Sequence, residues 1–177
     1  MSNSAERRGS LWRRWDLQVH TPFSALNNGF GDNFDAYARI FFAEAIARDI
    51  AVVGVTDYFS IEGYTKLKGL QADTEELEKI VGTENLSAAQ SILLLPNIEF
   101  RTSVLVHRPN GKDSRVNFHV IFSDEIPVAD VDEYFLRELK FTEESAPGVA
   151  DNKHALTKAN LSSLGAKLRA QHPTFAD

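Results

Sequence analysis

The chain has 177 residues, 43% of them hydrophobic, a formal net charge of −6 at pH 7 and no cysteine. This length suits one domain with a sizeable core, and the sequence shows neither an apolar run long enough to span a membrane nor the apolar segment of a secretory signal. The lack of cysteine excludes disulfides, zinc–thiolate sites and cysteine nucleophiles and favours a reducing cytoplasm, and the acidic balance disfavours a broad basic face for duplex nucleic acid.

The first half of the chain alternates strand-like and helical patterns. We expect residues 1–10 to be a disordered leader to one domain over residues 11–177. The stretch "LWRRWDLQVH" has a period of two and predicts a strand, with Asp16, Gln18 and His20 on one face and Trp15, Leu17 and Val19 on the other. After a loop, the pattern predicts a helix over 34–49, a buried strand over 50–57, a helix from Ser60, a surface helix over 74–81 and then a turn.

The second half continues with strands and then helices. It predicts two strands broken at Pro96–Asn97, a hairpin turn at Asn110–Gly111, a returning strand over 115–123, and helices over 128–139 and 155–171. Strands that alternate with helices indicate an α/β fold with a largely parallel sheet. Ligands of such folds bind at the carboxyl ends of the strands.

Acidic and histidine side chains stand in or just after the predicted strands: His20, Asp57, Glu99 and His119. A buried carboxylate needs a partner, and a divalent metal supplies one that also suits imidazole. Taken singly, His119 is typical of a hairpin or core histidine, Asp57 of a cap on the following helix, and Glu99 of an ion pair with Arg101. Four such residues at strand ends favour one common cause, a metal site.

The stretches "DLQVHTPFS", "VVGVTDYFS", "LLPNIEF" and "NFHVIF" resemble the successive motifs of the polymerase-and-histidinol-phosphatase (PHP) superfamily. This resemblance implies a distorted seven-stranded β/α barrel, here partial, that holds metal ions and hydrolyses phosphoesters. The first motif, His-x-His, falls on Gln18 and His20, and the second falls on Thr56, Asp57 and Tyr58. The next two ligands fall on Glu99 and His119.

A longer likeness, from "RGSLWRRWDLQVHTPFSALNNGFG" through "GVTDYFSIEGYTKL" to "LLPNIEFR", is to the N-terminal region of large TrlF-like PHP-ATPase proteins. It implies that the chain is the N-terminal part of a longer barrel or protein. It also implies an ATPase module in the same or a partner chain, a nucleic acid or nucleotide substrate, and a context such as phage defence.

The resemblance assigns roles to particular residues. The metal ligands are His20, Asp57, Glu99 and His119, for one to two Mn, Zn or Fe ions, and the residues of catalysis are Asp57, Glu99 and Arg101. Asp16 is expected to orient His20, and Arg101 to contact a substrate phosphate. Gln18 and Tyr58 replace histidines with poorer ligands. The alternative is therefore a degenerate, non-catalytic scaffold or partner-binding module with one metal ion or none.

Overall fold

The computed structural model describes residues 12–26, 29–107, 109, 111, 113–143 and 152–171. The expected leader over 1–10 lies outside these residues. At the centre is a four-stranded sheet with the order β1-β2-β3-β4. The strands are β1 (Arg14–Val19), β2 (Ile50–Tyr58), β3 (Leu93–His107) and β4 (Asp113–Ile121). The first three are parallel and β4 is antiparallel to β3, which confirms a mixed α/β class with a largely parallel sheet.

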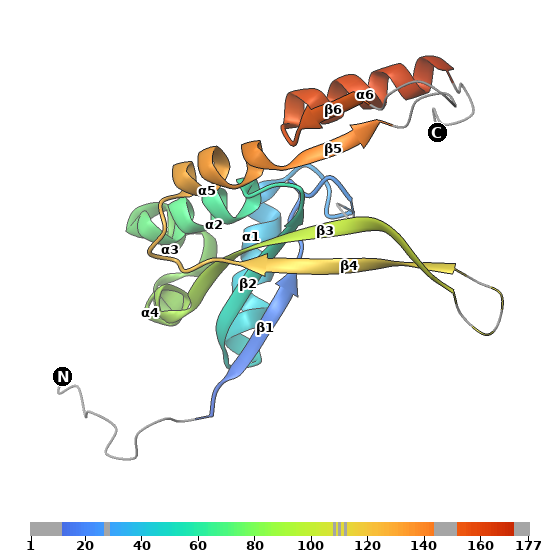
Figure 1. The fold of residues 1–177 in the computed structure, drawn as a ribbon. Helices are drawn as coiled ribbons and strands as arrows, with labels where there is room; N and C mark the ends of the chain where they lie inside the picture. Colours follow the sequence, from blue (N-terminus) through green and yellow to red (C-terminus); the bar gives the residue numbers. More distant parts are fainter. Residues whose placement is uncertain are drawn as a thin grey trace.

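Four helices connect β1 to β2 and β2 to β3 (Figure 1). They are α1 (Phe34–Ala47), α2 (Glu62–Ala72), α3 (Thr74–Val81) and α4 (Thr83–Ser91). Asn33 caps α1, because its side chain accepts a hydrogen bond from the backbone N–H of Ala36. A turn was expected where α4 lies, so that prediction was wrong.

The C-terminal part lies beside this unit, at the top of Figure 1. It consists of α5 (Val128–Tyr134), the 3-10 helix η1 (Leu136–Glu138), the strands β5 (Lys140–Glu143) and β6 (Asn152–Ala155), and α6 (Lys158–Gln171). The single helix expected over 128–139 is interrupted at Phe135, and the strands β5 and β6 were not predicted. Both are only four residues long, too short for a clear alternation pattern.

Strand β3 runs without a break through Pro96, where the sequence had predicted an interruption. Proline lacks only the N–H, and a strand residue directs its N–H and C=O to one neighbour only. The Pro96 carbonyl accepts a hydrogen bond from the backbone N–H of Phe122 at 2.9 Å. The predicted hairpin is confirmed by the antiparallel pairing of β3 with β4, and Gly111 in its connection has a positive φ of 74°.

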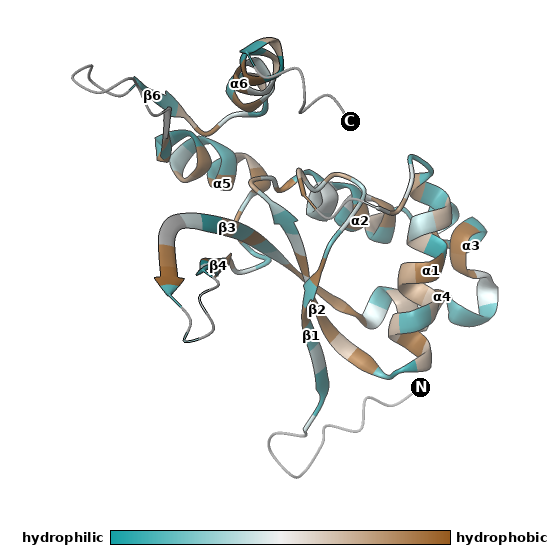
Figure 2. Ribbon diagram, turned by 90° about the vertical axis from the view of Figure 1, so that its right-hand side faces the viewer, coloured by the Kyte–Doolittle hydropathy of each residue, from teal (hydrophilic) through white to brown (hydrophobic). Residues whose placement is uncertain are grey.

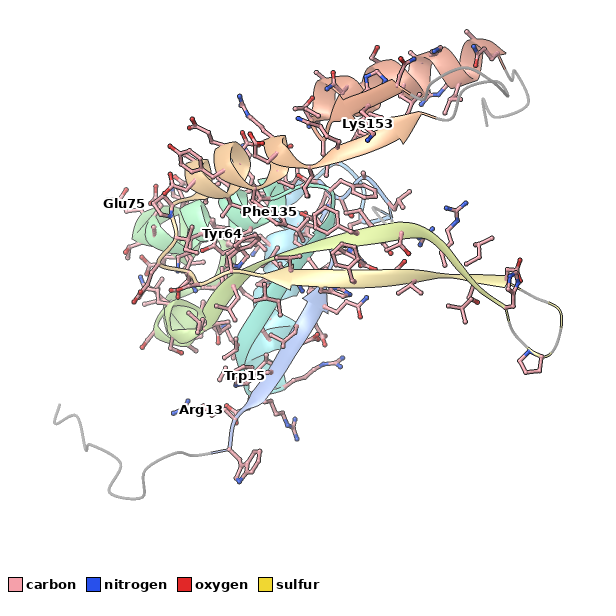
Figure 3. All side chains as sticks on the ribbon, in the orientation of Figure 1. Arg13, Trp15, Tyr64, Glu75, Phe135 and Lys153 are labelled. Carbon is pink, nitrogen blue, oxygen red and sulfur yellow. The ribbon has the colours of Figure 1, made fainter. Side chains whose placement is uncertain are left out.

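The hydrophobic core lies between the sheet and its helices. Its fully buried members include Phe42, Leu67, Leu77, Leu94 and Ile98. Figure 2 shows hydrophobic colour gathering where α1 and α3 lie together, and in Figure 3 Tyr64 lies toward this interior while Trp15 stands at the far end of β1. Within the described residues, no helix is long and apolar enough to cross a membrane.

Strand β1 departs from the alternation that the sequence predicted. Asp16 pairs with Val53 and Val19 pairs with Val55, so three steps along β1 match two along β2. Asp16 and Val19 therefore both align with core-facing valines, so the expectation that they lie on opposite faces of a regular strand was wrong. Gln18 lies inside this irregular stretch and has no paired residue on β2.

Candidate functional site

Glu99 on β3 is the centre of a polar cluster on the face of the sheet opposite the core. Its side chain is fully buried. Oε1 accepts hydrogen bonds from the hydroxyl of Tyr58 at 2.6 Å and from the amide of Asn117 at 2.7 Å. Oε2 has no hydrogen-bond partner among the described residues and lies 3.4 Å from Nε2 of His20. One oxygen of this carboxylate is thus held in place and the other is open toward an imidazole.

His20 follows β1 and is held by its ring and by its backbone. The ring stacks on Tyr58, with centroids 5.3 Å apart and planes 11° from parallel. The backbone carbonyl of His20 accepts a hydrogen bond from the hydroxyl of Tyr37 at 2.7 Å. Nδ1 is buried and has no hydrogen-bond partner in the described part of the chain. These contacts fix the direction in which Nε2 faces Glu99.

Tyr58 occupies the position where the resemblance expects a histidine ligand. Its hydroxyl donates to Glu99 and accepts from Asn117 at 2.9 Å and from Arg101 at 3.3 Å. Burial, and then the hydrogen bond to Glu99, raise the pKa of this phenol. The side chain is therefore a neutral hydrogen-bond donor at neutral pH, and it orients the carboxylate where a histidine would bind metal.

His119 on β4 stands directly across from Glu99, and its Nε2 lies 4.0 Å from Oε1 of that carboxylate. Its Nδ1 lies 3.3 Å from the amide nitrogen of Asn97. That amide nitrogen also donates to the carbonyl of Leu17 at 2.7 Å, which fixes the orientation of the amide. The same nitrogen donates to the hydroxyl of Thr56 at 2.8 Å, so Asn97 ties the ends of β1 and β2 together beside the ring of His119.

Asp57 is buried as predicted at the end of β2, but its carboxylate points to the other face of the sheet. Its two oxygens accept from the backbone N–H and the hydroxyl of Thr21, both at 2.8 Å. A further bond comes from the backbone N–H of Gly63, in the first turn of α2. Burial raises the pKa of Asp57, and these hydrogen bonds oppose that rise. The structure places Asp57 as a cap and a loop anchor and does not bring it to Glu99.

Arg101 shares the face of Glu99, as the sequence predicted, but contacts it only through neighbours. Its guanidinium donates to the Tyr58 hydroxyl and to the Asn117 side-chain oxygen, each at 3.3 Å. The cation also lies 5.4 Å from the centroid of the Tyr58 ring. Arg101 remains exposed, so its remaining donors face solvent at the mouth of the cluster.

Asp16 and Gln18 lie at the edge of the sheet. The Asp16 carboxylate accepts a hydrogen bond from the backbone N–H of Gln18 at 3.2 Å, and the structure shows no hydrogen bond between Asp16 and His20 in the described residues. Both side chains are exposed. The expected orienting role of Asp16 thus has no contact to support it, and Gln18 forms no hydrogen bond with Glu99 or His20 in the described residues.

Sequence reasoning missed three residues of this region: Thr21, Asn97 and Asn117. A signal for Asn117 was present, because it stands two positions before His119 on a strand and must share its face. Asn97 likewise stands two positions before Glu99. Thr21 follows His20 in a loop, where no periodicity indicates the direction of a side chain.

The spacing of His20 and Glu99 equals that of two ligands on one metal ion. Two ligand atoms bound about 2.1 Å from one ion at a tetrahedral angle are about 3.4 Å apart. The Nε2–Oε2 separation is 3.4 Å, and Oε2 is buried without a hydrogen bond. Within the described residues, however, no group of three or more His, Cys, Asp or Glu side chains is arranged to hold an ion. The protein thus offers two converging ligands there, fewer than a closed structural site needs.

Comparison with known proteins adds no relative to this picture: no family model, no curated protein and no solved structure matches the chain. The PHP resemblance therefore stays a prediction. The chemistry of the site rests on its own residues.

Proposed function

We propose that the chain is a metal-dependent phosphoesterase domain of the PHP type, with a reduced site that binds one divalent ion between His20 and Glu99. Manganese, zinc and iron suit this imidazole–carboxylate pair. The single observation that carries the proposal is the open oxygen Oε2 of Glu99, fully buried and aimed at Nε2 of His20. A buried carboxylate without a full set of partners is costly, and a bound cation offsets that cost.

The surrounding residues prepare this pair. Tyr58 and Asn117 hold one oxygen of Glu99, so the other keeps a fixed direction toward His20. The ring of Tyr58 stacks on the imidazole of His20 and keeps the two ring planes nearly parallel. Such restraint by neighbouring groups strengthens metal binding, since less freedom is lost on binding.

In this proposal Arg101 binds the phosphate of the substrate. Its exposed guanidinium is fixed over Tyr58 and presents further donors that match two oxygens of a phosphate. A bound divalent ion would supply a water activated near neutral pH and a Lewis acid for a phosphoryl oxygen. We propose a nucleic acid or nucleotide phosphoester as substrate and an ATPase module as partner, on the strength of the sequence motifs.

A second candidate is a scaffold without catalysis. The observation in its favour is that the Tyr58 hydroxyl takes the side of Glu99 where a histidine ligand was expected, and no three-residue ligand group forms in the described chain. In this case Glu99 and Tyr58 form a structural hydrogen-bonded pair, and the domain serves to bind a partner.

Metal content and hydrolysis of bis(p-nitrophenyl) phosphate by protein purified without chelator test the proposal. We expect about one equivalent of metal and manganese-dependent hydrolysis, both lost in Glu99→Gln. Glu133→Gln, at an exposed position, is the matched control and should change neither. Wild-type protein that takes up no metal, even after loading, would leave the scaffold as the function.

A further inference from the structure

A cleft of about 620 Å³ lies between α6 and the loops that follow β1 and β2. Its walls come from residues 22–25, residues 58–60 with Glu62, and one side of α6. Figure 1 shows α6 on the side of the molecule where the loop after β1 lies. Ligand sites of this size are typical of small molecules or short segments of a polymer.

The α6 wall is one continuous face of the helix. The residues that line the cleft follow the helical spacing of three and four: Lys158, Leu161, Ser162, Gly165, Ala166 and Arg169. A cation stands at each end, and a rise of 1.5 Å per residue places their Cα atoms about 16 Å apart along the helix. Between the cations, Ser162, Gly165 and Ala166 have small side chains, which let a ligand approach this part of the helix closely.

The opposite wall combines aromatic rings with hydroxyls. Phe23 and Phe59 are half-buried, and Ser24 and Ser60 lie beside them. Phe59 has a positive φ of 59°, a backbone conformation that residues other than glycine rarely adopt. A left-handed backbone at a non-glycine residue is strained and is found often at ligand sites.

The cleft adjoins the metal-binding pair through Tyr58. This residue lines the cleft, its hydroxyl binds Glu99, and its ring stacks on His20. A ligand in the cleft therefore lies against the residue that contacts both Glu99 and His20.

The charges in the cleft leave one cation available. Lys158 bridges the cleft by a 2.9 Å ion pair with Glu62 of α2. Arg169 has neither an ion pair nor a hydrogen bond with any described side chain and is exposed. A free guanidinium at one end and a lysine in a surface ion pair at the other suit an anion that reaches along the helix, since surface pairs are weak and exchange readily.

We propose that this cleft binds a short segment of single-stranded nucleic acid. Phosphates contact Arg169 and, after displacing Glu62, Lys158, while unpaired bases stack on Phe23 and Phe59. The two cations, three helical turns apart, suit several successive phosphates better than one free nucleotide. The net charge of −6 does not suit a duplex, which needs a broad basic face. This inference rests on the proposed function only in naming its substrate, because binding is measured separately from hydrolysis.

Fluorescence anisotropy with a labelled six-residue oligothymidylate, in chelator to prevent hydrolysis, tests the cleft. Arg169→Glu should weaken binding about tenfold and lower the salt slope by about one, as loss of a phosphate contact does. Lys167→Glu makes the same charge change on the same helix outside the cleft and should leave affinity within about twofold. Equal weakening in the two variants would show general electrostatics and overturn the proposal.

A steric variant avoids the question of charge. A Cβ added at Gly165 would meet nothing within 4 Å, so we expect Gly165→Leu to fold and to narrow the cleft. Gly69→Leu, on α2 and equally open, is the control. We expect affinity to fall at least fivefold in Gly165→Leu alone. Unchanged affinity in that variant, or binding of thymidine monophosphate or duplex as tight as that of the strand, would overturn the proposal. Failure of the proposed metal site is a separate result: the wild-type protein would then contain no metal, whatever its affinity for the oligothymidylate.

Discussion

Asp57 and Glu99 are both buried carboxylates near the ends of neighbouring strands, yet their surroundings differ. Asp57 receives hydrogen bonds on both oxygens, from Thr21 and from the start of α2. Glu99 has one oxygen bonded and one open, directed at an imidazole. Burial alone therefore does not identify a functional carboxylate. The open oxygen of Glu99 is the difference on which the proposed metal site rests, because a buried polar atom normally has a hydrogen-bond partner.

The difference follows from strand register. Tyr58, not Asp57, pairs directly with Glu99, and Asp57 pairs with Ile98. Successive side chains on a strand point to opposite faces, so Asp57 and Glu99 lie on opposite sides of one sheet. A substitution can therefore disturb the surroundings of Asp57 and leave those of Glu99 intact, or the reverse.

Gly63→Ala should be the most damaging change on the Asp57 side. An added Cβ would collide with the Asp57 carboxylate and with the side chain of Thr21. We expect a loss of about 3 kcal/mol or more in the free energy of unfolding, as for other overpacked and disrupted buried sites. Urea unfolding measures it. Gly69→Ala, on the same helix with open space, should instead gain up to about 1 kcal/mol, and equal losses in both variants would contradict the account.

Tyr58→Phe should weaken the Glu99 side by a smaller amount. The change removes the hydroxyl that donates to Glu99 and accepts from Asn117. Loss of a buried hydrogen bond to a charged group costs about 1.5–3 kcal/mol. Thermal unfolding of Tyr58→Phe is compared with that of Tyr134→Phe, where the ring is exposed and the change should be within about 0.5 kcal/mol. A Tyr58 variant as stable as the Tyr134 control would show that the hydroxyl does not hold Glu99.

How much of this the sequence predicted depends on the kind of residue. His20, Glu99 and His119 were placed near one another because the carboxyl ends of parallel strands and a hairpin bring them to one edge. Asp57 was included on the same ground, although its neighbour Tyr58 was the residue facing Glu99. A residue at a strand end belongs to one face or the other, and only the pairing with β3 decides which.

Contacts between residues that are far apart in the sequence could not be predicted from it. The bond between Asp57 and Thr21 joins positions 36 apart, and the irregular register of β1 follows from how it packs on β2. Gly54 allows that packing, because a Cβ there would lie 2.6 Å from the carbonyl oxygen of Leu17. Alternation along β1 could not reveal such a shift, since it assumes a regular strand.

The pH dependence of stability separates Asp57 from other carboxylates. Its pKa in the folded protein is raised by burial, so the folded state holds this proton more tightly than the unfolded state does. The stability of wild type relative to Asp57→Asn should therefore be greatest at acidic pH and decline as pH rises from the ordinary aspartate pKa through the raised one. Urea unfolding across acidic to neutral pH measures this difference. A difference that grows with pH would contradict the burial argument.

Gln18→His should have the smallest effect on stability, within about 0.5 kcal/mol, because the position is exposed. It stands two positions before His20 and supplies the imidazole that the motif lacks. We expect tighter manganese binding, measured by electron paramagnetic resonance of free Mn²⁺. Gln90→His, exposed on α4, is the control and should give no gain. Equal gains in the two variants would mean that the added histidine acts outside the site.

Calorimetric titration of metal-free protein with Mn²⁺ tests the contrast between the two carboxylates most directly. We predict about one ion bound by wild type, about one by Asp57→Asn, and none by Glu99→Gln. Wild-type protein that binds no ion, or a Glu99→Gln variant that binds as wild type does, would contradict the assignment of Glu99 as the metal-binding carboxylate.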